Sequence, residues 1–349
     1  MRRSTILAAG IGVALAGRKL LARPLADLTG EVAIVTGGSR GLGLLLAREL
    51  SRQGCRTVIC ARDEAELERA RTELRQEGIE VVALRCDVAD QAQVTRMTEE
   101  VTRQFGRIDI LVNVAGIIQV GPLDEMTVED FRRAHDVMYW GSVYPTLAVL
   151  PAMRDRWHGR IVNITSIGGK VSVPHLMPYS AAKFAAVGFS EGLRAELAGT
   201  GITVTTIAPG LMRTGSHLNA AFKGRQEQEF TWFGLGASLP FISIDAERAA
   251  RQIVGAMRRG EADRTLTVPA TLLATFHGVL PGVTADIFGL VNRFVLPSSG
   301  GAGTRADRGM TIEDRSPSAA RDALTEWGQN AAERFNEHPG PVGVTAPMP

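Results

Sequence analysis

Short apolar segments alternate with helical segments along most of the chain. Apolar segments that predict strands lie at residues 31–36, 57–61, 81–87, 108–115, 160–165, 202–208 and 264–268. Helical spacing of apolar residues predicts helices at 41–53, 64–76, 94–105, 131–153 and 184–197. Strands and helices in this alternation are typical of parallel strands joined by crossover helices. We therefore predict an α/β fold, a doubly wound parallel sheet of about seven strands that fills residues 28–268.

A glycine-rich turn joins the first predicted strand to the first predicted helix. It runs Thr-Gly-Gly-Ser-Arg-Gly-Leu-Gly and begins at Thr36. Gly37, Gly41 and Gly43 permit a tight turn, a close approach of phosphate to the backbone, and close packing of the helix on the strand. The start of the helix then offers unpaired N–H groups to that phosphate. The arrangement predicts a Rossmann-type dinucleotide site.

Two arginines bear on the choice of cofactor. In sites for NAD, an acidic residue usually ends the second strand and binds the ribose 2′-hydroxyl. Here Arg62 follows that strand, and Arg40 lies inside the glycine turn. Two guanidinium groups suit the extra 2′-phosphate of NADP, so NADP is the predicted cofactor and NAD the alternative. In the competing interpretation, both are ordinary surface arginines with Asp63 or Glu64 as partners.

A serine, a tyrosine and a lysine follow in an arrangement that suits carbonyl chemistry. Ser166 comes directly after the fifth strand, at the carboxyl edge of the sheet where such folds bind ligands. Tyr179 and Lys183 are four residues apart, so they share one face of a helix. A neighbouring ammonium favours the phenolate, and we expect Lys183 to lower the tyrosine pKa from its ordinary ~10. Tyr179 then acts as acid and base, Ser166 holds the substrate oxygen, and a nicotinamide carries the hydride.

In combination these motifs resemble those of the short-chain dehydrogenase/reductase family, in its non-extended branch. The resemblance covers about residues 28–270 and implies Ser166, Tyr179 and Lys183 as the catalytic residues, NAD(P) as the cofactor, and a homo-oligomer. It also implies that Tyr179 and Lys183 touch the cofactor. Further cofactor contacts implied by the resemblance are Ser39 and Leu42 in the turn, Asp87 and Val88 at the adenine, Asn113, Ala115 and Gly116 after the fourth strand, and Pro209, Gly210 and Thr214 near the nicotinamide.

One position departs from the family pattern. Many members carry an asparagine on the long helix, within Val-Asn-x-x-Gly, whose backbone carbonyl holds a water beside the lysine. The matching stretch begins at Val137, and Met138 replaces the asparagine. Methionine keeps the carbonyl but lacks the amide, so either the proton relay survives or the enzyme is slower. The same departure supports a rival interpretation, a catalytically weak NAD(P)-binding sensor or membrane-tethered scaffold.

The substrate is predicted from the segment that follows the sixth strand. The resemblance identifies residues 211–240 as a substrate loop, which contains Phe222, Phe230, Trp232 and Phe233. These rings predict a lipophilic small-molecule substrate, unless they only cover the core. His175, four residues before the tyrosine, is a candidate for the substrate pocket. The histidines lack metal-binding spacing, so we expect no metal site.

Charge and cysteine content narrow the function further. The formal net charge is +2, too small for nucleic-acid binding by bulk electrostatics. Three cysteines without Cys-x-x-Cys spacing indicate reduced thiols in a cytoplasmic compartment. An epimerase or dehydratase of the extended branch is disfavoured, because its turn is normally Thr-Gly-x-x-Gly-x-x-Gly. The sequence therefore predicts a cytoplasmic oxidoreductase.

Three segments lie outside the sheet domain. Residues 1–27 contain an uncharged run at 4–17 with basic residues on both sides, so a membrane-leaning helix and an unattached extension are both open. Residues 269–297 are apolar and form one amphipathic face, for which a second subunit and the substrate pocket are alternatives to a slightly favoured peripheral membrane contact. Residues 298–349 are rich in Gly, Ser, Arg and Pro and are expected to be largely disordered, with one short helix around 319–335.

Overall fold

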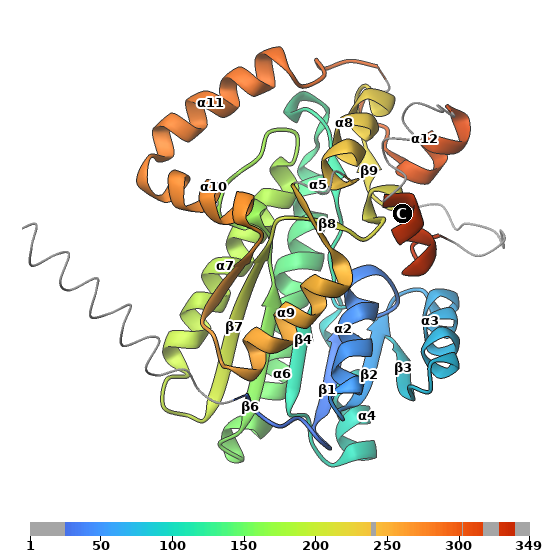
Figure 1. The fold of residues 1–349 in the computed structure, drawn as a ribbon, viewed down its shortest axis with the longest axis vertical. Coiled ribbons are helices and arrows are strands. Elements are labelled where there is room, and N and C mark those ends of the chain that lie inside the picture. Colours follow the sequence, from blue (N-terminus) through green and yellow to red (C-terminus); the bar gives the residue numbers. More distant parts are fainter. Residues whose placement is uncertain (1–24, 239–241, 302, 317–327, 339–349) are drawn as a thin grey trace, which may run out of the picture.

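The protein forms a three-layer α/β fold in the computed structural model, which describes residues 25–238, 242–301, 303–316 and 328–338 (Figure 1). Its central strands are β1 Val32–Thr36, β2 Arg56–Ala61, β3 Val81–Arg85, β4 Ile110–Asn113, β6 Gly159–Ile164, β7 Ile202–Pro209 and β11 Asp263–Leu266. They form one parallel sheet in the order β11-β7-β6-β4-β1-β2-β3. The predicted doubly wound sheet is therefore confirmed.

The two faces of the sheet carry separate hydrophobic cores. One face is covered by α2 Gly41–Arg52, α3 Glu64–Gln76 and α9 Ala246–Arg258, and the other by α4 Gln91–Phe105, α6 Gly141–Asp155 and α7 Met177–Glu196. All five residues of β1 are buried. Because successive side chains of a strand point to opposite faces, Val35 packs in the α2 core and Ile34 in the α4 core. This explains why β1 is apolar throughout rather than alternating.

The strand order reverses between β1 and β4. From β1 the chain builds outward through β2 and β3, then returns to add β4 on the opposite side of β1. Val35 pairs with Ile59 of β2 on one side and with Val112 of β4 on the other. Ligands of open α/β sheets bind outside the carboxyl ends of the strands at such a reversal. The glycine-rich turn follows β1 at this point.

The helix predicted at 131–153 is interrupted. It consists of α5 Val128–His135, a π-helical segment η2 Asp136–Trp140, and then α6. A capping box starts α5, in which Thr127 accepts from the backbone of Asp130 and the Asp130 side chain accepts in return. Single π turns inside α-helices occur often at functional sites, and this one carries Met138.

A small group of short strands and helices packs on the carboxyl edge of the main sheet. It contains β5 Gln119–Val120, β9 Ala221–Phe222, β12 Asp307–Arg308, α8 Gln226–Ser238 and α12 Gly309–Arg315, beside the pair β8 Leu211–Arg213 and β10 Ser243–Asp245. Short 3₁₀ turns η1 Leu123–Glu125, η3 Ile167–Gly169 and η4 Ser216–Leu218 connect these elements. Phe222, Phe230 and Phe233 form a separate apolar cluster here with Ile312 of α12.

The disorder expected for residues 298–349 is wrong for much of the described part. Residues 303–316 add β12 and α12 to the small group of elements on the carboxyl edge of the sheet. Residues 328–334 are helical. Phe335 is 2% exposed and belongs to the core that contains α2 and α9. The error arises because the segment is polar overall, and its few apolar residues are buried by partners distant in the sequence. The rest of the predicted helix at 319–335 lies outside the described residues.

Two apolar helices project from the carboxyl edge of the sheet. They are α10 Val268–Val279 and α11 Pro281–Phe294, which follow β11 and are bent by 120° where they meet (Figure 1). Within the described residues, no single helix is long and apolar enough to cross a membrane. The bent pair α10 and α11 reaches that length and hydropathy only when the two helices are taken together. The uncharged run at 4–17 lies outside the described residues.

Candidate active site

The glycine-rich turn is packed so closely that side chains would not fit at several of its positions. Gly37 has a φ of +66°, and a Cβ there would lie 2.8 Å from the Cα of Ala115. A Cβ on Gly43 would overlap the carbonyl oxygen of Gly37. Glycine is therefore required for the turn to sit against the loop after β4 and for α2 to begin directly above β1.

Thr36 fixes the relative position of the two loops. Its hydroxyl oxygen accepts hydrogen bonds from the backbone N–H of Val114 at 3.0 Å and of Ala115 at 3.3 Å. The turn after β1 and the loop after β4 thus form one rigid floor at the strand reversal. Gly116 continues this floor, and the Nζ of Lys183 lies 3.8 Å from where a Cβ of Gly116 would be.

The structure brings Ser166, Tyr179 and Lys183 together beside this floor. Ser166 follows β6, and its hydroxyl accepts from the N–H of Gly168 at 3.0 Å. Tyr179 and Lys183 both lie on α7. The side chains of Ser166 and Tyr179 converge at Gly168, whose Cβ position would lie 3.5 Å from the Ser166 Oγ and 3.1 Å from the Tyr179 Cε1. The spatial arrangement matches what the spacing in the sequence predicts.

The electrostatics of the tyrosine and the lysine differ from the sequence expectation. Burial raises the pKa of Tyr179, and its hydrogen bond with Ser166 offsets that effect only in part. Burial also lowers the pKa of Lys183 to about 8. The Nζ of Lys183 lies 5.9 Å from the centre of the tyrosine ring and donates to the carbonyl of Ile164 at 2.9 Å. Desolvation of both groups therefore outweighs the expected lowering of the tyrosine pKa.

Met138 lies next to Lys183. Its Cγ and Sδ are each 3.7 Å from the Cβ position of Gly116, which is also the point that Lys183 approaches. The side chain is 1% exposed and packs with Ala182 and Tyr179 in a small apolar cluster. Its carbonyl accepts from the hydroxyl of Ser142 at 3.0 Å. Methionine thus occupies the expected position and makes the surroundings of the tyrosine apolar.

Asn113 has a structural role in this structure. It is 2% exposed, and its amide nitrogen donates to Asn163 at 2.8 Å and to Thr146 at 3.2 Å. These contacts join β4 to β6 and to α6. The amide of Asn113 therefore holds β4 against its neighbours beneath the two loops. Its contact with the cofactor remains a prediction.

The other predicted cofactor residues line the same edge. Val88 is buried, and a Cβ on Gly141 would lie 2.7 Å from its Cγ2, so it packs on the start of α6. Asp87 accepts from the N–H of Ala89 at 3.0 Å. Ser39, Leu42, Pro209 and Thr214 are buried, whereas Gly210 is partly exposed. All lie in loops or helix starts at the carboxyl ends of the strands.

Both arginines have carboxylate partners, but different ones from those considered. Arg40 lies 3.7 Å from Glu66 and 3.4 Å from Glu337. Arg62 is half exposed and lies 3.9 Å from Asp87. Asp63 instead caps α3, where it accepts from the backbone of Glu66. The pairing with Asp63 or Glu64 is therefore not found, and Arg62 is held only loosely.

His175 forms a buried pair with an acid that the sequence did not single out. Its Nδ1 lies 2.8 Å from Glu229 of α8, which is fully buried and also accepts from the indole of Trp232 at 2.7 Å. His175 adopts the left-handed conformation with a φ of +64°, which is uncommon outside glycine. The pair ties the start of α7 to the segment at 211–240.

The aromatic rings of that segment pack on one another. The ring centres of Phe222 and Phe230 are 5.4 Å apart, and those of Phe222 and Phe233 are 6.0 Å apart, both in edge-on geometry. All three are buried. For these three rings the interpretation in which they cover a core is therefore correct, whereas Trp232 is only partly buried.

Residues 335–337 also contact the glycine turn, and no sequence signal indicated this. The N–H of Gly41 donates to the carbonyl of Phe335 at 2.8 Å. A Cβ on Gly41 would overlap the carboxylate of Glu337, which lies beside Arg40. A backbone that accommodates an anion at the start of α2 fits the phosphates of a dinucleotide. The described residues contain no cluster of side chains suited to a metal ion.

Comparisons with known proteins agree with this geometry. The family model for short chain dehydrogenase matches residues 31–223. A protein assigned as a ketoacyl reductase in Streptomyces coelicolor is 41% identical over 192 residues, which cover 54% of this chain and 74% of that protein. The dehydrogenase/reductase SDR family member 7B of Bos taurus is 32% identical over 268 residues, which cover 75% of this chain and 81% of that protein.

Solved structures share the architecture. A short-chain dehydrogenase from Streptomyces avermitilis has a TM-score of 0.65 and 30% identity, and the match covers 76% of this chain and 98% of that one. A variant of actinorhodin polyketide ketoreductase, solved with NADPH, has a TM-score of 0.59 and 34% identity. That match covers 70% of this chain and 97% of the ketoreductase.

Proposed function

Since the chain belongs to the short-chain dehydrogenase family, we propose that it is an NADP-preferring oxidoreductase that interconverts carbonyl and alcohol groups on lipophilic small molecules. Membership makes it an NAD(P)-dependent enzyme acting on CH–OH groups. The observation that carries the proposal is the placement of Ser166, Tyr179 and Lys183 beside the glycine floor at the strand reversal.

The chain's own residues supply the proton and the orientation. A bound nicotinamide supplies or accepts the hydride. Tyr179 gives a proton to the substrate oxygen during reduction and takes it back during oxidation, while the hydroxyl of Ser166 holds that oxygen. Because burial raises the pKa of Tyr179, the phenol is protonated near neutral pH. A protonated phenol suits reduction of the carbonyl.

Preference for NADP is supported by the two arginines. Arg62 lies at the carboxyl end of β2, and among the described residues the one carboxylate paired with its half-exposed guanidinium is that of Asp87, 3.9 Å away. It can therefore turn toward a 2′-phosphate with little loss. The related ketoreductase structure contains NADPH.

A lipophilic substrate is supported by the side chains around the tyrosine. Val137, Met138, Ala182 and Ile117 form an apolar cluster against Tyr179. A substrate whose carbonyl reaches this tyrosine would place its neighbouring atoms against these side chains. Apolar substituents there gain free energy by leaving water.

The test is turnover with a substrate panel. Purified protein is assayed for NADPH and NADH oxidation with short aldehydes, aryl ketones and long-chain ketones, and the products are identified by mass spectrometry. We expect the highest kcat/KM with NADPH and an apolar ketone. Nucleotide binding without turnover on any carbonyl would favour the weak sensor or scaffold instead.

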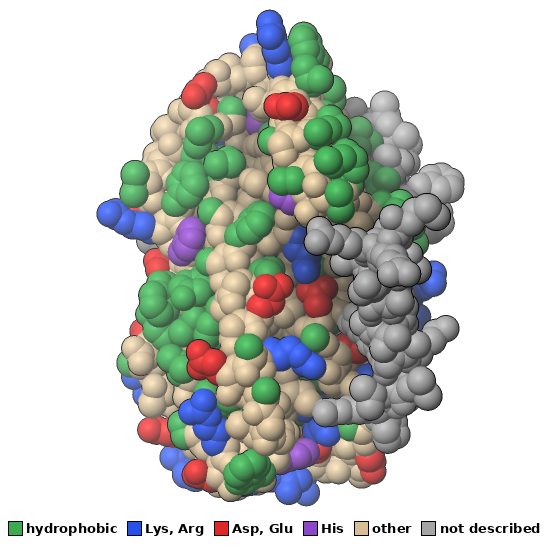
Figure 2. Space-filling view, turned by 90° about the vertical axis from the view of Figure 1, so that its left-hand side faces the viewer, with side chains coloured by type: hydrophobic (Ala, Val, Ile, Leu, Met, Phe, Trp, Pro, Cys, Tyr) green, Lys and Arg blue, Asp and Glu red, His purple; other side chains and the backbone are tan. Residues whose placement is uncertain are grey.

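We also propose that the enzyme works in the cytoplasm at a lipid surface, which it contacts through α10 and α11. Hydrophobic side chains gather on the face of the molecule shown in Figure 2, over these helices in its upper part. His277, Asp286 and Arg293 are the only titratable side chains on the pair. The exposed apolar side chains are Val268, Leu272, Phe276, Val279, Val283, Ile287, Leu290 and Phe294. An apolar surface of this kind favours insertion into the interface of a bilayer.

The test of the lipid contact compares the full chain with a variant of α10 and α11. Leu272→Glu/Leu290→Glu places two charges on exposed positions of α10 and α11. We expect the full chain to sediment with vesicles of phosphatidylcholine and phosphatidylglycerol, and the variant to stay in solution with unchanged kcat. Light scattering follows the oligomeric state, because a wild-type oligomer that the variant dissociates would assign this face to a second subunit.

A further inference from the structure

The final described segment lies across the glycine turn. Residues 328–338, drawn in dark red in Figure 1, reach the start of α2. The carbonyl of Phe335 accepts from the N–H of Gly41 at 2.8 Å. The amide of Asn336 donates to the carbonyl of Ser39 at 2.7 Å and to that of Glu66 at 3.1 Å. The segment thus binds the backbone groups that line the start of the helix.

A carboxylate completes the contact. Glu337 is 5% exposed, and its side chain lies 3.4 Å from Arg40 and accepts from Asn219 at 2.7 Å. A Cβ on Gly41 would overlap its Oε1, so the carboxylate lies against the bare backbone of the turn. A helix start with free backbone and a neighbouring arginine is a site for phosphate. Glu337 places its own anion there.

We propose that residues 335–337 are a built-in competitor of the dinucleotide: they occupy the phosphate cradle, and the cofactor binds only after they leave it. The N–H of Gly41 cannot serve Phe335 and a phosphate in the same geometry. A second anion beside Glu337 would also meet repulsion in a poorly solvated site. Docking of the segment and binding of the cofactor are therefore mutually exclusive.

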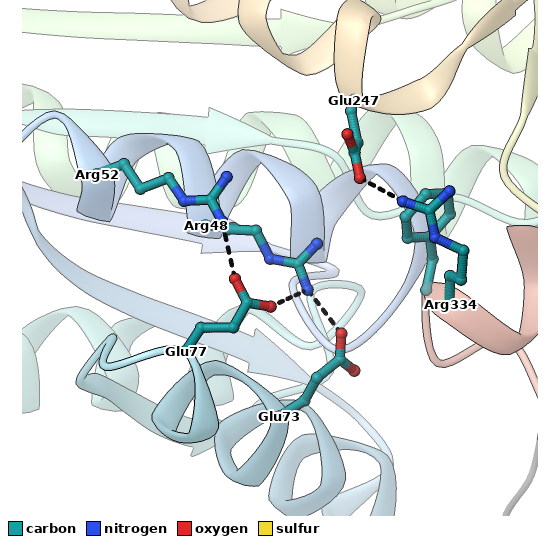
Figure 3. A pocket seen from close by; sticks show the side chains of 7 residues that line it. Arg48, Arg52, Glu73, Glu77, Glu247 and Arg334 are labelled. Carbon is teal, nitrogen blue, oxygen red and sulfur yellow. Dashed lines mark hydrogen bonds and ion pairs between the residues drawn. The ribbon is translucent and has the colours of Figure 1, made fainter.

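The attachment of the segment includes a weak side. A cavity of about 330 Å³ lies between α2, α3, α9 and the segment, and Figure 3 shows the side chains that line it. It is lined by Arg48, Arg52, Glu73, Glu77, Glu247, Arg334 and Phe335. Arg334 crosses it to pair with Glu247 at 2.7 Å, and both side chains are exposed. An exposed ion pair contributes little to stability, so the Arg334–Glu247 pair adds little resistance to release of the segment.

The carboxylate itself is held at a cost. Burial raises the pKa of Glu337, and Arg40 and Asn219 offset that effect only in part. A buried anion that is incompletely compensated destabilises the docked state. Phe335, which is 2% exposed within the core around α2 and α9, supplies apolar burial that offsets this cost. The free-energy difference between the docked and released states is therefore smaller than it would be if the contact were entirely apolar.

The experiment measures nucleotide affinity on the full chain. Asn336→Ala removes the bonds to Ser39, Glu66 and Arg69 and leaves Phe335 and Glu337 in place. Loss of three net hydrogen bonds should raise the released fraction, and with it the apparent affinity for NADP⁺ and NADPH, by about tenfold or more. Arg334→Ala loosens the segment from the other side and should act in the same direction. The matched control is Glu333→Ala, an exposed neighbour expected to leave the affinity unchanged.

Hydrogen exchange provides a readout that does not depend on turnover. Saturating NADP⁺ should speed amide exchange in residues 328–338 while it slows exchange in the glycine turn. Slower exchange in the segment, or a Kd that is unchanged or weaker in Asn336→Ala, overturns the competitor. Because the inference rests on the proposed dinucleotide site, failure of every form to bind nucleotide would overturn both. Equal binding by all forms would overturn only the inference.

Discussion

The ammonium of Lys183 donates a hydrogen bond to the backbone carbonyl of Ile164 at 2.9 Å, which joins α7 to the end of β6. The side chain is 4% exposed, and burial lowers its pKa to about 8. The group that the chemistry needs is thus maintained against a desolvation penalty. This relationship predicts a trade between stability and activity that depends on pH.

Replacing Lys183 with methionine should stabilise the fold at pH 7 and destabilise it at high pH. Lys183 has an ordinary pKa of 10.5 when unfolded and about 8 when folded. Between these values the unfolded chain holds the proton and the folded chain does not, so wild-type stability rises with pH across this window. Below pH 8 the wild type carries a penalty of roughly 3 kcal/mol, against ~1 kcal/mol for the hydrogen bond that methionine loses.

Urea unfolding at pH 7 and pH 10.5 measures this change. We expect Lys183→Met to raise the free energy of unfolding by about 1–2 kcal/mol at pH 7 and to lower it by ~1 kcal/mol at pH 10.5. Turnover should be lost at both. A wild type that is the more stable protein at pH 7 would contradict the cost assigned to the buried ammonium.

Tyr179→Phe should remove the proton donor and keep the pocket. The ring stays against Met138, and only the phenol hydroxyl is lost. We expect kcat to fall by about 10²–10⁴, with the Kd for NADPH largely unchanged in a fluorescence titration. Near-normal turnover would rule out this tyrosine as the acid and base.

A methyl group at Gly43 should abolish nucleotide binding. A Cβ there would overlap the carbonyl of Gly37 and push α2 away from the turn. The matched control is Gly192→Ala, an exposed position inside α7 with no heavy atom within 4 Å of the added carbon. The control should raise stability by about 0.5–1 kcal/mol and leave binding intact. Isothermal titration with NADPH separates the two, and normal binding by Gly43→Ala would refute the packing argument.

Arg62→Asp should change the cofactor preference. The charge reversal removes the guanidinium proposed for the 2′-phosphate, and the cost should fall on NADP and not on NAD. We expect the ratio of Kd values, NAD over NADP, to fall by about tenfold or more. Arg71→Asp, on the exposed side of α3 and paired with Glu68, is the control. An unchanged ratio would remove Arg62 from the phosphate site.

Local patterns were sufficient to predict the sheet and the spacing of the catalytic residues. The strand at Val32–Thr36 is buried on both faces, so it is apolar throughout and bounded by turns. Tyr179 and Lys183 share a face because four residues make about one helical turn. In such cases neighbours in the sequence decide the structure.

Contacts between distant residues were beyond the sequence patterns. Glu229 sits in a helix of mixed polarity, and only the fold brings it to His175, 54 positions earlier. The direction of the tyrosine pKa was also mistaken, since spacing shows the charge of Lys183 but not the burial that outweighs it. Phe335 and Glu337 lie in a polar stretch without periodicity, so the local sequence gives no sign that they are buried.

Asn336 and the carbonyl it reaches at Ser39 are separated by 297 positions. On the ribosome the chain emerges at ~5–20 residues per second, with its amino-terminal part folding first. The glycine turn and α2 are therefore assembled well before the residues that cover them leave the exit tunnel. During synthesis there is therefore an interval in which nucleotide can bind without competition from residues 335–337. Protein made in the presence of abundant cofactor should first have nucleotide bound, whereas protein refolded without cofactor should first have this segment docked.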